Sequence, residues 1–329
     1  MEDGSVEHEL KLIGLSTNHQ LSQKIADEIG ESLMPMTINQ FADGEIYERI
    51  MDSVRGADVY VIAPIAGEVN DSFMEIMIVV DALRRASAHQ INLVLPYFGY
   101  VRQDRKTKSR EPITAKMVSS LIEMNGVARV LAVDLHADQV QGFFDIPVDQ
   151  LLAAPLLTEY FFERNFDLED LVVFAPDHNG AGRARQFASI LGTNWGVIND
   201  RAVEEDIKNP NGIVGEVAGK RVLVVDDIID TGKRMTRSAQ ALRYAGANEV
   251  YVAATHGVFS EGSVERLADC PEVERVIVTD SVDIPAEKHF NKLEVVTVAP
   301  LIAAAIERIH EDRELSGLLR SRHNPDIKI

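Results

Sequence analysis

Short runs of apolar, mostly β-branched residues alternate along the chain with segments in which apolar residues recur every three or four positions. We interpret the runs as strands, and they cover residues 58–63, 91–95, 129–133, 171–175, 221–225, 249–254, 274–279 and 293–298. The segments between them have the period of helices, as in the C-terminal series 301–309. Because this alternation is typical of βαβ units, the pattern predicts an α/β fold with mainly parallel sheets.

The chain is long enough for two domains of ordinary size, and its pattern of elements divides near residues 145–151. Each half contains a buried strand that ends in an acid before a loop, at Asp134 in the first half and at Asp226 and Asp227 in the second. We therefore predict two similar doubly wound domains with a site between them, comprising residues 1–149 and 150–329.

The strand that ends at Asp226 and Asp227 is followed by an Asp-Thr-Gly turn and a predicted helix over 235–244. In a parallel sheet this order places two carboxylates and a turn at the carboxyl end of a strand, where a helix N-terminus attracts anions. The carboxylates themselves suit sugar hydroxyls or Mg²⁺ bound to a phosphorylated ligand. The segment therefore predicts a ribose-phosphate site; an acidic strand end with an ordinary turn is the alternative.

A basic loop follows the predicted strand 91–95. It carries five cations within the nine positions 102–110, and Pro96 and Gly99 interrupt regular structure before it. Arginine makes bidentate contacts with phosphate and lysine supplies a point charge, so the loop suits a triphosphate. The alternative is a run of solvated charges.

Three further segments carry polar side chains that could form part of a site. Asp134-Leu135-His136 ends one buried strand, and Asp177-His178-Asn179-Gly180 lies between another strand and a helix. A metal-bound diphosphate suits the second segment, whereas a buried histidine and simple capping by Asp177 are the structural alternatives. The third segment, 41–45, is an Asp-Gly turn that carries an aromatic residue and two acids.

The composition is that of an acidic globular protein, with 33 Lys plus Arg against 52 Asp plus Glu and a net charge of −19. This charge argues against non-specific binding to nucleic acid or anionic membranes. No apolar run approaches the ~20 residues that span a bilayer, and the acidic N-terminus does not resemble a signal peptide. The single cysteine, Cys270, fits a reducing compartment. We expect a cytoplasmic protein with no nucleic-acid or membrane partner.

Taken together, the motifs resemble those of the ribose-phosphate diphosphokinases, the synthetases of phosphoribosyl diphosphate. The resemblance rests on segments 41–45, 96–105, 109–116, 134–137, 141–147 and 226–231. It implies two phosphoribosyltransferase-like domains and a hexamer built from dimers, or a hetero-oligomer with an active paralogue. The implied reaction moves the β,γ-diphosphoryl group of Mg-ATP to the 1-hydroxyl of ribose 5-phosphate, and AMP is the second product.

The resemblance also implies roles for individual residues. Adenine is held across a subunit interface by Phe41, Asp43 and Glu45. The rest of ATP is contacted by Arg102, Gln103, Asp104 and His136, and Mg²⁺ by His136 and Asp177. Ribose 5-phosphate is bound by Asp226, Asp227, Asp230, Thr231, Gly232, Lys233 and Arg234.

The chain departs from the family pattern close to the expected reaction centre. Asp200 and Ala202 stand where active members of the family carry a catalytic lysine and a partner arginine, and Arg201 is the predicted substitute cation. Lys233 and Arg234 replace a small residue and a hydroxyl in the phosphate loop. Two hypotheses follow: a divergent, slower second synthetase, or a non-catalytic paralogue that binds nucleotide and regulates an active one. A purine phosphoribosyltransferase explains 226–231 but not the other motifs.

Overall fold

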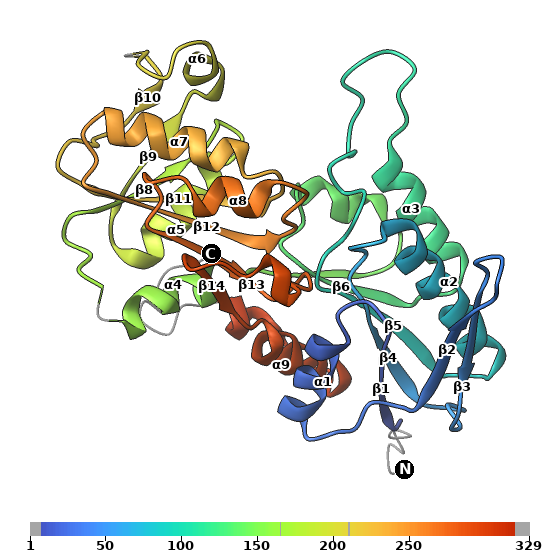
Figure 1. Cartoon of the computed structure of the whole chain (residues 1–329). Helices are drawn as coiled ribbons and strands as arrows, with labels where there is room; N and C mark the ends of the chain where they lie inside the picture. The colour runs from blue at the N-terminus through green and yellow to red at the C-terminus, as the bar shows by residue number, and fades with distance from the viewer. Residues whose placement is uncertain (1–7, 165, 210, 320–329) are drawn as a thin grey trace. The chain divides into compact units, whose positions relative to one another are not determined.

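The computed structural model describes residues 8–164, 166–209 and 211–319, which form two compact units (Figure 1). The first unit ends at Leu151 and includes the later segment Ala299–Leu318, whereas the second covers Leu152–Val298. The predicted division between 149 and 150 lies two residues before the first change of unit. It differs at the C-terminus, because the last helix packs against the first helix of the chain and so belongs to the first unit.

The first unit is built on a five-stranded parallel sheet with the order β1-β4-β5-β6-β7. The strands are β1 (Leu10–Gly14), β4 (Asp58–Ile62), β5 (Gln90–Leu95), β6 (Arg129–Val133) and β7 (Val148–Leu151). The helices are α1 (His19–Ile29), α2 (Val69–Arg85), α3 (Thr114–Met124), η1 (Asp138–Phe143) and α9 (Ala299–His310), with η3 (Ser316–Leu319) after them.

The core of the first unit forms because its central strands are apolar on both faces, as parallel strands covered by helices must be. Helix α2 covers the sheet with the apolar stripe Ile76, Val79, Val80 and Leu83, spaced for one helical face. Full burial of each such side chain contributes about 1.5–3 kcal/mol.

A separate antiparallel hairpin, β2 (Met36–Gln40) and β3 (Ile46–Ile50), packs beside α2. It brings Glu48 into partly buried surroundings, where both carboxylate oxygens are buried and have no hydrogen-bond partner among the described residues. Burial, followed by the nearby negative charge of Glu75, raises the pKa of Glu48 to about 8. Glu48 is therefore protonated in the folded state at neutral pH.

Replacing Glu48 by glutamine should stabilise the first unit at alkaline pH. The folded-state pKa lies above the unfolded value of 4.5, so stability from the protonated carboxyl is lost as pH rises through about 8. Because the side chain is only partly buried, we expect a gain of about 2–4 kcal/mol at about pH 9 and little change at about pH 4. Urea unfolding at both pH values measures this, with the exposed Glu28→Gln as control; equal effects at the two pH values would contradict it.

The second unit contains a seven-stranded sheet with the order β10-β9-β8-β11-β12-β13-β14, parallel except for β10. The strands are β8 (Leu171–Ala175), β9 (Asn194–Ile198), β10 (Ile213–Val214), β11 (Arg221–Ile229), β12 (Glu249–Gly257), β13 (Arg275–Thr279) and β14 (Leu293–Val296). The helices are α4 (Ala154–Glu163), α5 (Ala181–Leu191), α6 (Asp200–Glu205), α7 (Lys233–Tyr244), α8 (Ser263–Ala268) and η2 (Ala286–Lys288).

The predicted α/β fold with mainly parallel sheets is confirmed. All eight predicted strands are present with bounds shifted by a few residues, and β11 continues through the two acids to Ile229. The sequence pattern did not indicate β1, the β2–β3 hairpin, β7, β9 or β10. Within the part of the chain that the structure describes, no helix is both long and apolar enough to cross a bilayer.

Candidate functional site

The direction of the chain reverses at the middle of the second unit's sheet. Strand β8 is followed by α5 and then by β9 on one side, whereas β11 is followed by α7 and then by β12 on the other. Open α/β sheets bind ligands at such a switch point, beyond the carboxyl ends of the two strands. The strand ends here carry Asp177, after β8, and Asp226 and Asp227, in the second half of β11.

These three acids are almost fully buried, with 8%, 7% and 4% of their surface exposed. Strand β11 pairs with β8 only as far as Val224 and continues beyond it along β12 alone. Asp226 and Asp227 therefore lie beyond the part of β11 that pairs with β8. Asp177 Oδ1 accepts from the Gly180 amide at 3.0 Å and shapes the turn before α5. Asp177 thus fixes the turn but does not cap α5, whose N-cap residue is Gly180, and its second oxygen lies 3.3 Å from Arg234.

Two arginines enter the acid cluster formed by Asp177, Asp226 and Asp227. Arg183, on the first turn of α5, lies 3.5 Å from an oxygen of Asp226 and 3.5 Å from one of Asp227. Arg234, on the first turn of α7, lies 3.3 Å from Asp177 Oδ2 and 3.3 Å from Asp226 Oδ2. Two guanidinium groups against three carboxylates leave the cluster with a negative balance, which favours a ligand that brings hydroxyl donors or a cation.

The close approach of these carboxylates affects the protonation of Asp226. Burial, then the charge of Asp227 and the hydrogen bond with it, raise the pKa of Asp226 to about 7, while Arg183 and Arg234 act in the opposite direction. Partial burial opposes the charge of Arg234, but Asp226, Asp177 and Asp200 outweigh it and raise the pKa of this guanidinium. Asp200 therefore acts on the cluster through Arg234.

The turn Asp230-Thr231-Gly232 links β11 to α7. Ser260 donates its hydroxyl to the Asp230 carboxylate, and Arg266 donates to the carbonyl of Thr231. Gly232 caps α7 with φ 71°, and a Cβ there would lie 3.1 Å from Leu267 Cγ, so the position requires glycine. The turn is thus held rigidly from two sides.

The first turn of α7 contains no acid and carries two cations, Lys233 and Arg234. Cations are unfavourable beside the positive end of a helix dipole, so this end is suited to bind an anion. Lys233 borders a cavity of about 330 Å³ between α6 and α7, in which Arg237 and Glu204 form an ion pair of 3.0 Å. Arg234 instead turns toward the acid cluster.

Helix α6 begins at Asp200, and Asn199 caps it by accepting from the Ala202 amide at 3.4 Å. Arg201, predicted as the substitute cation, is exposed and forms no hydrogen bond or ion pair with another described residue. Arg183 and Arg234, by contrast, both contact the acid cluster.

In the first unit, the basic loop and the segment after β6 lie side by side, because β5 and β6 are neighbours in the sheet. Gln139 donates to Asp104 at 2.7 Å, and Thr114, at the start of α3, donates to Gln103 at 2.6 Å. Gly99 permits a close approach of the loops after β4 and β5, since a Cβ there would lie 2.4 Å from the Ile65 carbonyl oxygen.

Arg102 belongs to the first of these two segments and His136 to the second, where its side chain is exposed. Asp134, two residues before His136, has a φ of 38°, which is uncommon for a residue other than glycine. Such backbone strain is common at functional sites. The structure thus brings the predicted ATP residues of the first unit onto two adjacent strand ends.

Phe41, Asp43 and Glu45 lie at the tip of the β2–β3 hairpin, away from the loop that precedes α3 (Figure 1). Asp43 accepts from the Glu45 amide at 3.2 Å and fixes the turn. Phe41 is 56% exposed, an unusual exposure for an aromatic residue and one that suits contact with a ligand or a second chain.

His136 belongs to the first unit and Asp177 to the second, so the metal site predicted from this pair remains a prediction. The donor set of the second unit fits Mg²⁺, because Asp177, Asp226 and Asp227 are buried oxygen ligands with an incompletely balanced charge. Sequence reasoning missed the role of Arg183, whose only signal was its position on the first turn of the helix after Asp177.

Comparison with known proteins agrees with this architecture. Residues 10–126 match the model of the N-terminal domain of ribose phosphate pyrophosphokinase, and residues 198–320 match that of the phosphoribosyl synthetase-associated domain. A Lactiplantibacillus plantarum protein named "Putative ribose-phosphate pyrophosphokinase 2" is 50% identical over 95% of this chain and 97% of its own. "Ribose-phosphate pyrophosphokinase 2" of Enterococcus faecalis is 45% identical over 95% and 97%.

Among solved structures, phosphoribosylpyrophosphate synthetase from Mycobacterium smegmatis superposes with a TM-score of 0.87, at 39% identity, over 92% of this chain and 99% of that one. The chain thus has the two-unit α/β fold of a phosphoribosylpyrophosphate synthetase. The chain belongs to the ribose-phosphate pyrophosphokinase family.

Proposed function

We propose that the protein transfers the β,γ-diphosphoryl group of ATP to the 1-hydroxyl of ribose 5-phosphate, giving AMP and 5-phosphoribosyl 1-diphosphate. The observation that carries this proposal is the buried acid cluster at the switch point, directly beside the cationic first turn of α7. Carboxylates there accept from sugar hydroxyls, while the adjacent helix end binds the 5-phosphate. Family membership supplies the reaction class.

In the second unit, Asp226 and Asp227 hold the ribose hydroxyls, and Asp230 through Arg234 surround the 5-phosphate. Arg234 is able to change partner, because its carboxylate contacts of 3.3 Å are loose and its side chain is half exposed. Phosphate binding would draw it away from Asp226 and release that carboxylate for the sugar. The phosphate is then held by side-chain charge as well as by backbone amides.

In the first unit, Arg102, Gln103, Asp104 and His136 contact the phosphates and ribose of ATP. The exposed tip of the hairpin offers Phe41, Asp43 and Glu45 to adenine on a neighbouring copy, since it lies at the end of a separate two-stranded sheet. This requires an oligomer, and we propose a hexamer built from dimers in the cytoplasm.

Mg²⁺ would be held in the second unit by Asp177, and it would neutralise charge on the triphosphate when bound. Catalysis then depends mainly on in-line positioning and on cations near the transferred group. Asp200 carries a negative charge where a cation is needed. Arg201, the next residue of α6, is therefore our candidate for that cation, and it would reach the transferred group only if α6 moved.

A second function competes with the first: a nucleotide-binding paralogue that regulates an active synthetase by co-assembly. Two observations favour it. Asp200 places a carboxylate on the helix from which the family offers a cation, and Arg234 ties up Asp177 and Asp226. The charge of Asp200 opposes transfer of an anionic group, and the ion pairs of Arg234 occupy carboxylates that a metal ion or sugar would need.

One assay separates the two functions. Purified protein incubated with Mg²⁺, phosphate, ATP and ribose 5-phosphate should form AMP and phosphoribosyl diphosphate in equal amounts, measured by ion-exchange chromatography. The Asp227→Asn variant is the control for a contaminating enzyme, because it should lose this product. ATP binding by calorimetry without any product would reject the enzyme and favour the regulatory paralogue.

A further inference from the structure

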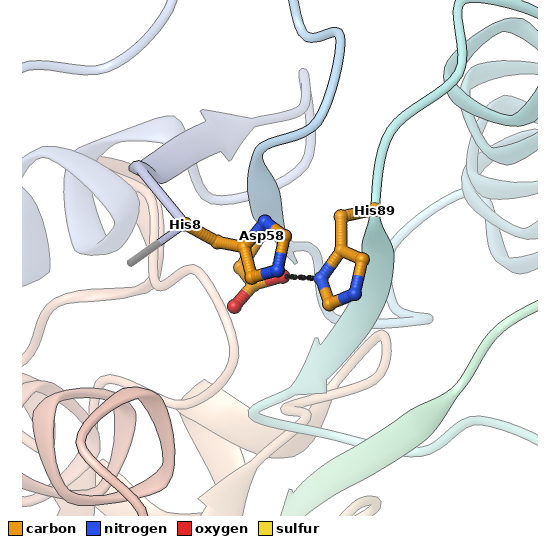
Figure 2. Close-up of side chains that lie close together, drawn as sticks. All are labelled: His8, Asp58 and His89. Atoms are coloured by element: carbon orange, nitrogen blue, oxygen red, sulfur yellow. Dashed lines mark hydrogen bonds and ion pairs between the residues drawn. The ribbon is translucent and has the colours of Figure 1, made fainter. Parts of the chain in front are cut away.

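Three side chains with metal-binding atoms meet at the amino edge of the first unit's sheet (Figure 2). His8 precedes β1, Asp58 begins β4, and His89 immediately precedes β5. The register pairs Leu10 with Asp58 and Asp58 with Gln90, so the three strands begin side by side. One donor atom from each of the three residues lies within 4.8 Å of the other two.

This cluster lies apart from the nucleotide residues of the same unit. The strands β1, β4, β5 and β6 are parallel, so their starts and their ends lie at opposite edges of the sheet. The loops with Arg102 and His136 follow strand ends, whereas His8, Asp58 and His89 lie at strand starts. A ligand at this edge therefore does not occupy the proposed ATP site.

The two imidazoles of the cluster are held by one polar contact each and by stacking on each other. His8 Nδ1 lies 2.8 Å from the Gly56 carbonyl oxygen. Because a carbonyl only accepts, Nδ1 is the donor and Nε2 keeps its lone pair. His89 Nδ1 lies 2.7 Å from Asp58 Oδ1, and the two rings stack with centroids 3.5 Å apart and planes 7° apart. The carbonyl contact of His8 is of the kind that orients the ring of a ligating histidine. Stacked rings direct their in-plane lone pairs in parallel, and Asp58 cannot both orient His89 and bind the same ion. The His89 ring would therefore turn away from Asp58 Oδ1 when the ion binds.

A third histidine approaches the same carboxylate from α9. His310 Nδ1 lies 3.6 Å from Asp58 Oδ2, and this nitrogen is buried without a hydrogen-bond partner among the described residues. Two ligand atoms on one tetrahedral Zn²⁺ are separated by about 3.4 Å, since each lies about 2.1 Å from the ion. The spacing and the unsatisfied nitrogen together suit a shared ion, because an orphaned buried nitrogen costs free energy.

The surroundings favour a cation over an anion. A cavity of about 480 Å³ opens beside His8 and His310, and its other charged lining residues are Glu9, Glu31, Glu307 and Glu311. Four carboxylates raise the local concentration of cations and repel phosphate.

We propose that His8, Asp58, His89 and His310 bind one Zn²⁺ ion. Imidazole nitrogens with a single carboxylate match the ligand preference of zinc and not that of Mg²⁺, which prefers oxygen ligands. The ion links the starts of three strands to the last residue of α9, the helix that returns to the first unit after the whole of the second. Its effect is to fasten that helix and stabilise the first unit.

The test is Zn²⁺ binding by the untagged full chain, freed of metal with a chelator and titrated in competition with a chromogenic chelator in excess Mg²⁺. One Zn²⁺ per chain is expected for the wild type. His8→Ala, His89→Ala and His310→Ala should each weaken this binding by about 10- to 100-fold or more. Zn²⁺ should raise the midpoint of thermal unfolding in the wild type and have no such effect in these variants.

Two histidine variants serve as matched controls. His19→Ala removes an exposed imidazole from the same unit, and His136→Ala removes the one assigned to the nucleotide site; both should bind Zn²⁺ like the wild type. His8 precedes the first strand, so its variant should fold, which circular dichroism checks. Unchanged Zn²⁺ binding in His8→Ala and His89→Ala, or its loss only in His136→Ala, would overturn the proposal.

Discussion

Replacing Asp200 by lysine and Ala202 by arginine should raise kcat for phosphoribosyl diphosphate synthesis by roughly 10²- to 10³-fold. The carboxylate of Asp200 begins α6 and raises the pKa of Arg234, so its charge reaches the acid cluster. A cation in its place would stabilise negative charge on the transferred group instead of repelling it, and one such contact is worth roughly 3–4 kcal/mol. Steady-state rates at saturating ATP and ribose 5-phosphate measure the change.

The control for this double variant changes charge by the same sign elsewhere on α6. Glu205→Lys introduces a cation at an exposed position on the same short helix and should leave kcat unchanged. Asp200→Asn separates the loss of repulsion from the gain of a cation, and we expect it to give a smaller increase. If the double variant shows no gain while it still binds both substrates, Lys233 and Arg234 limit turnover instead.

Most predicted strands carry a largely apolar run, because strands buried on both faces leave that signal in the sequence. Strand β14, which lies at the sheet margin and is mostly half-buried, is the exception. The missed strands β1, β7, β9 and β10 lie at or next to a sheet margin, where fewer positions are buried; β9 has exposed Asn194 and Trp195. The assignment of α9 to the first unit depends on its packing against α1. No local pattern reports such a long-range contact.

The candidate site was predictable where a motif is continuous and unpredictable where partners come from different elements. The acids of β11 and the turn after them were visible as one segment. The ion pairs of Arg183 and Arg234 with those acids depend on how α5 and α7 approach the sheet. His8, Asp58 and His89 share no motif at all, since only the register of three strands brings them together.

Replacing Asp226 by asparagine should stabilise the second unit at neutral to alkaline pH while it reduces activity. The carboxyl has a folded-state pKa of about 7 against 3.8 for the ordinary group, so the stability that its protonated form contributes is lost as pH rises through about 7. A neutral isostere avoids this loss and keeps the oxygen that accepts from the Asp227 amide at 3.0 Å. The gain is at most about 4 kcal/mol at about pH 8, and less because Arg183 and Arg234 lose a partner.

The same substitution should lower kcat/KM for ribose 5-phosphate by about 10- to 100-fold, because a hydrogen bond to a charged acceptor contributes about 1.5–3 kcal/mol. Asp280→Asn is the matched control: it neutralises another buried carboxylate of the unit, one that accepts from the Val298 amide at 2.8 Å, outside the cluster. That variant should leave kcat/KM unchanged. Urea unfolding at about pH 5 and about pH 8 measures the stability effect. If the stability of Asp226→Asn depended on pH as that of the wild type does, ionisation of Asp226 would not be what destabilises the cluster.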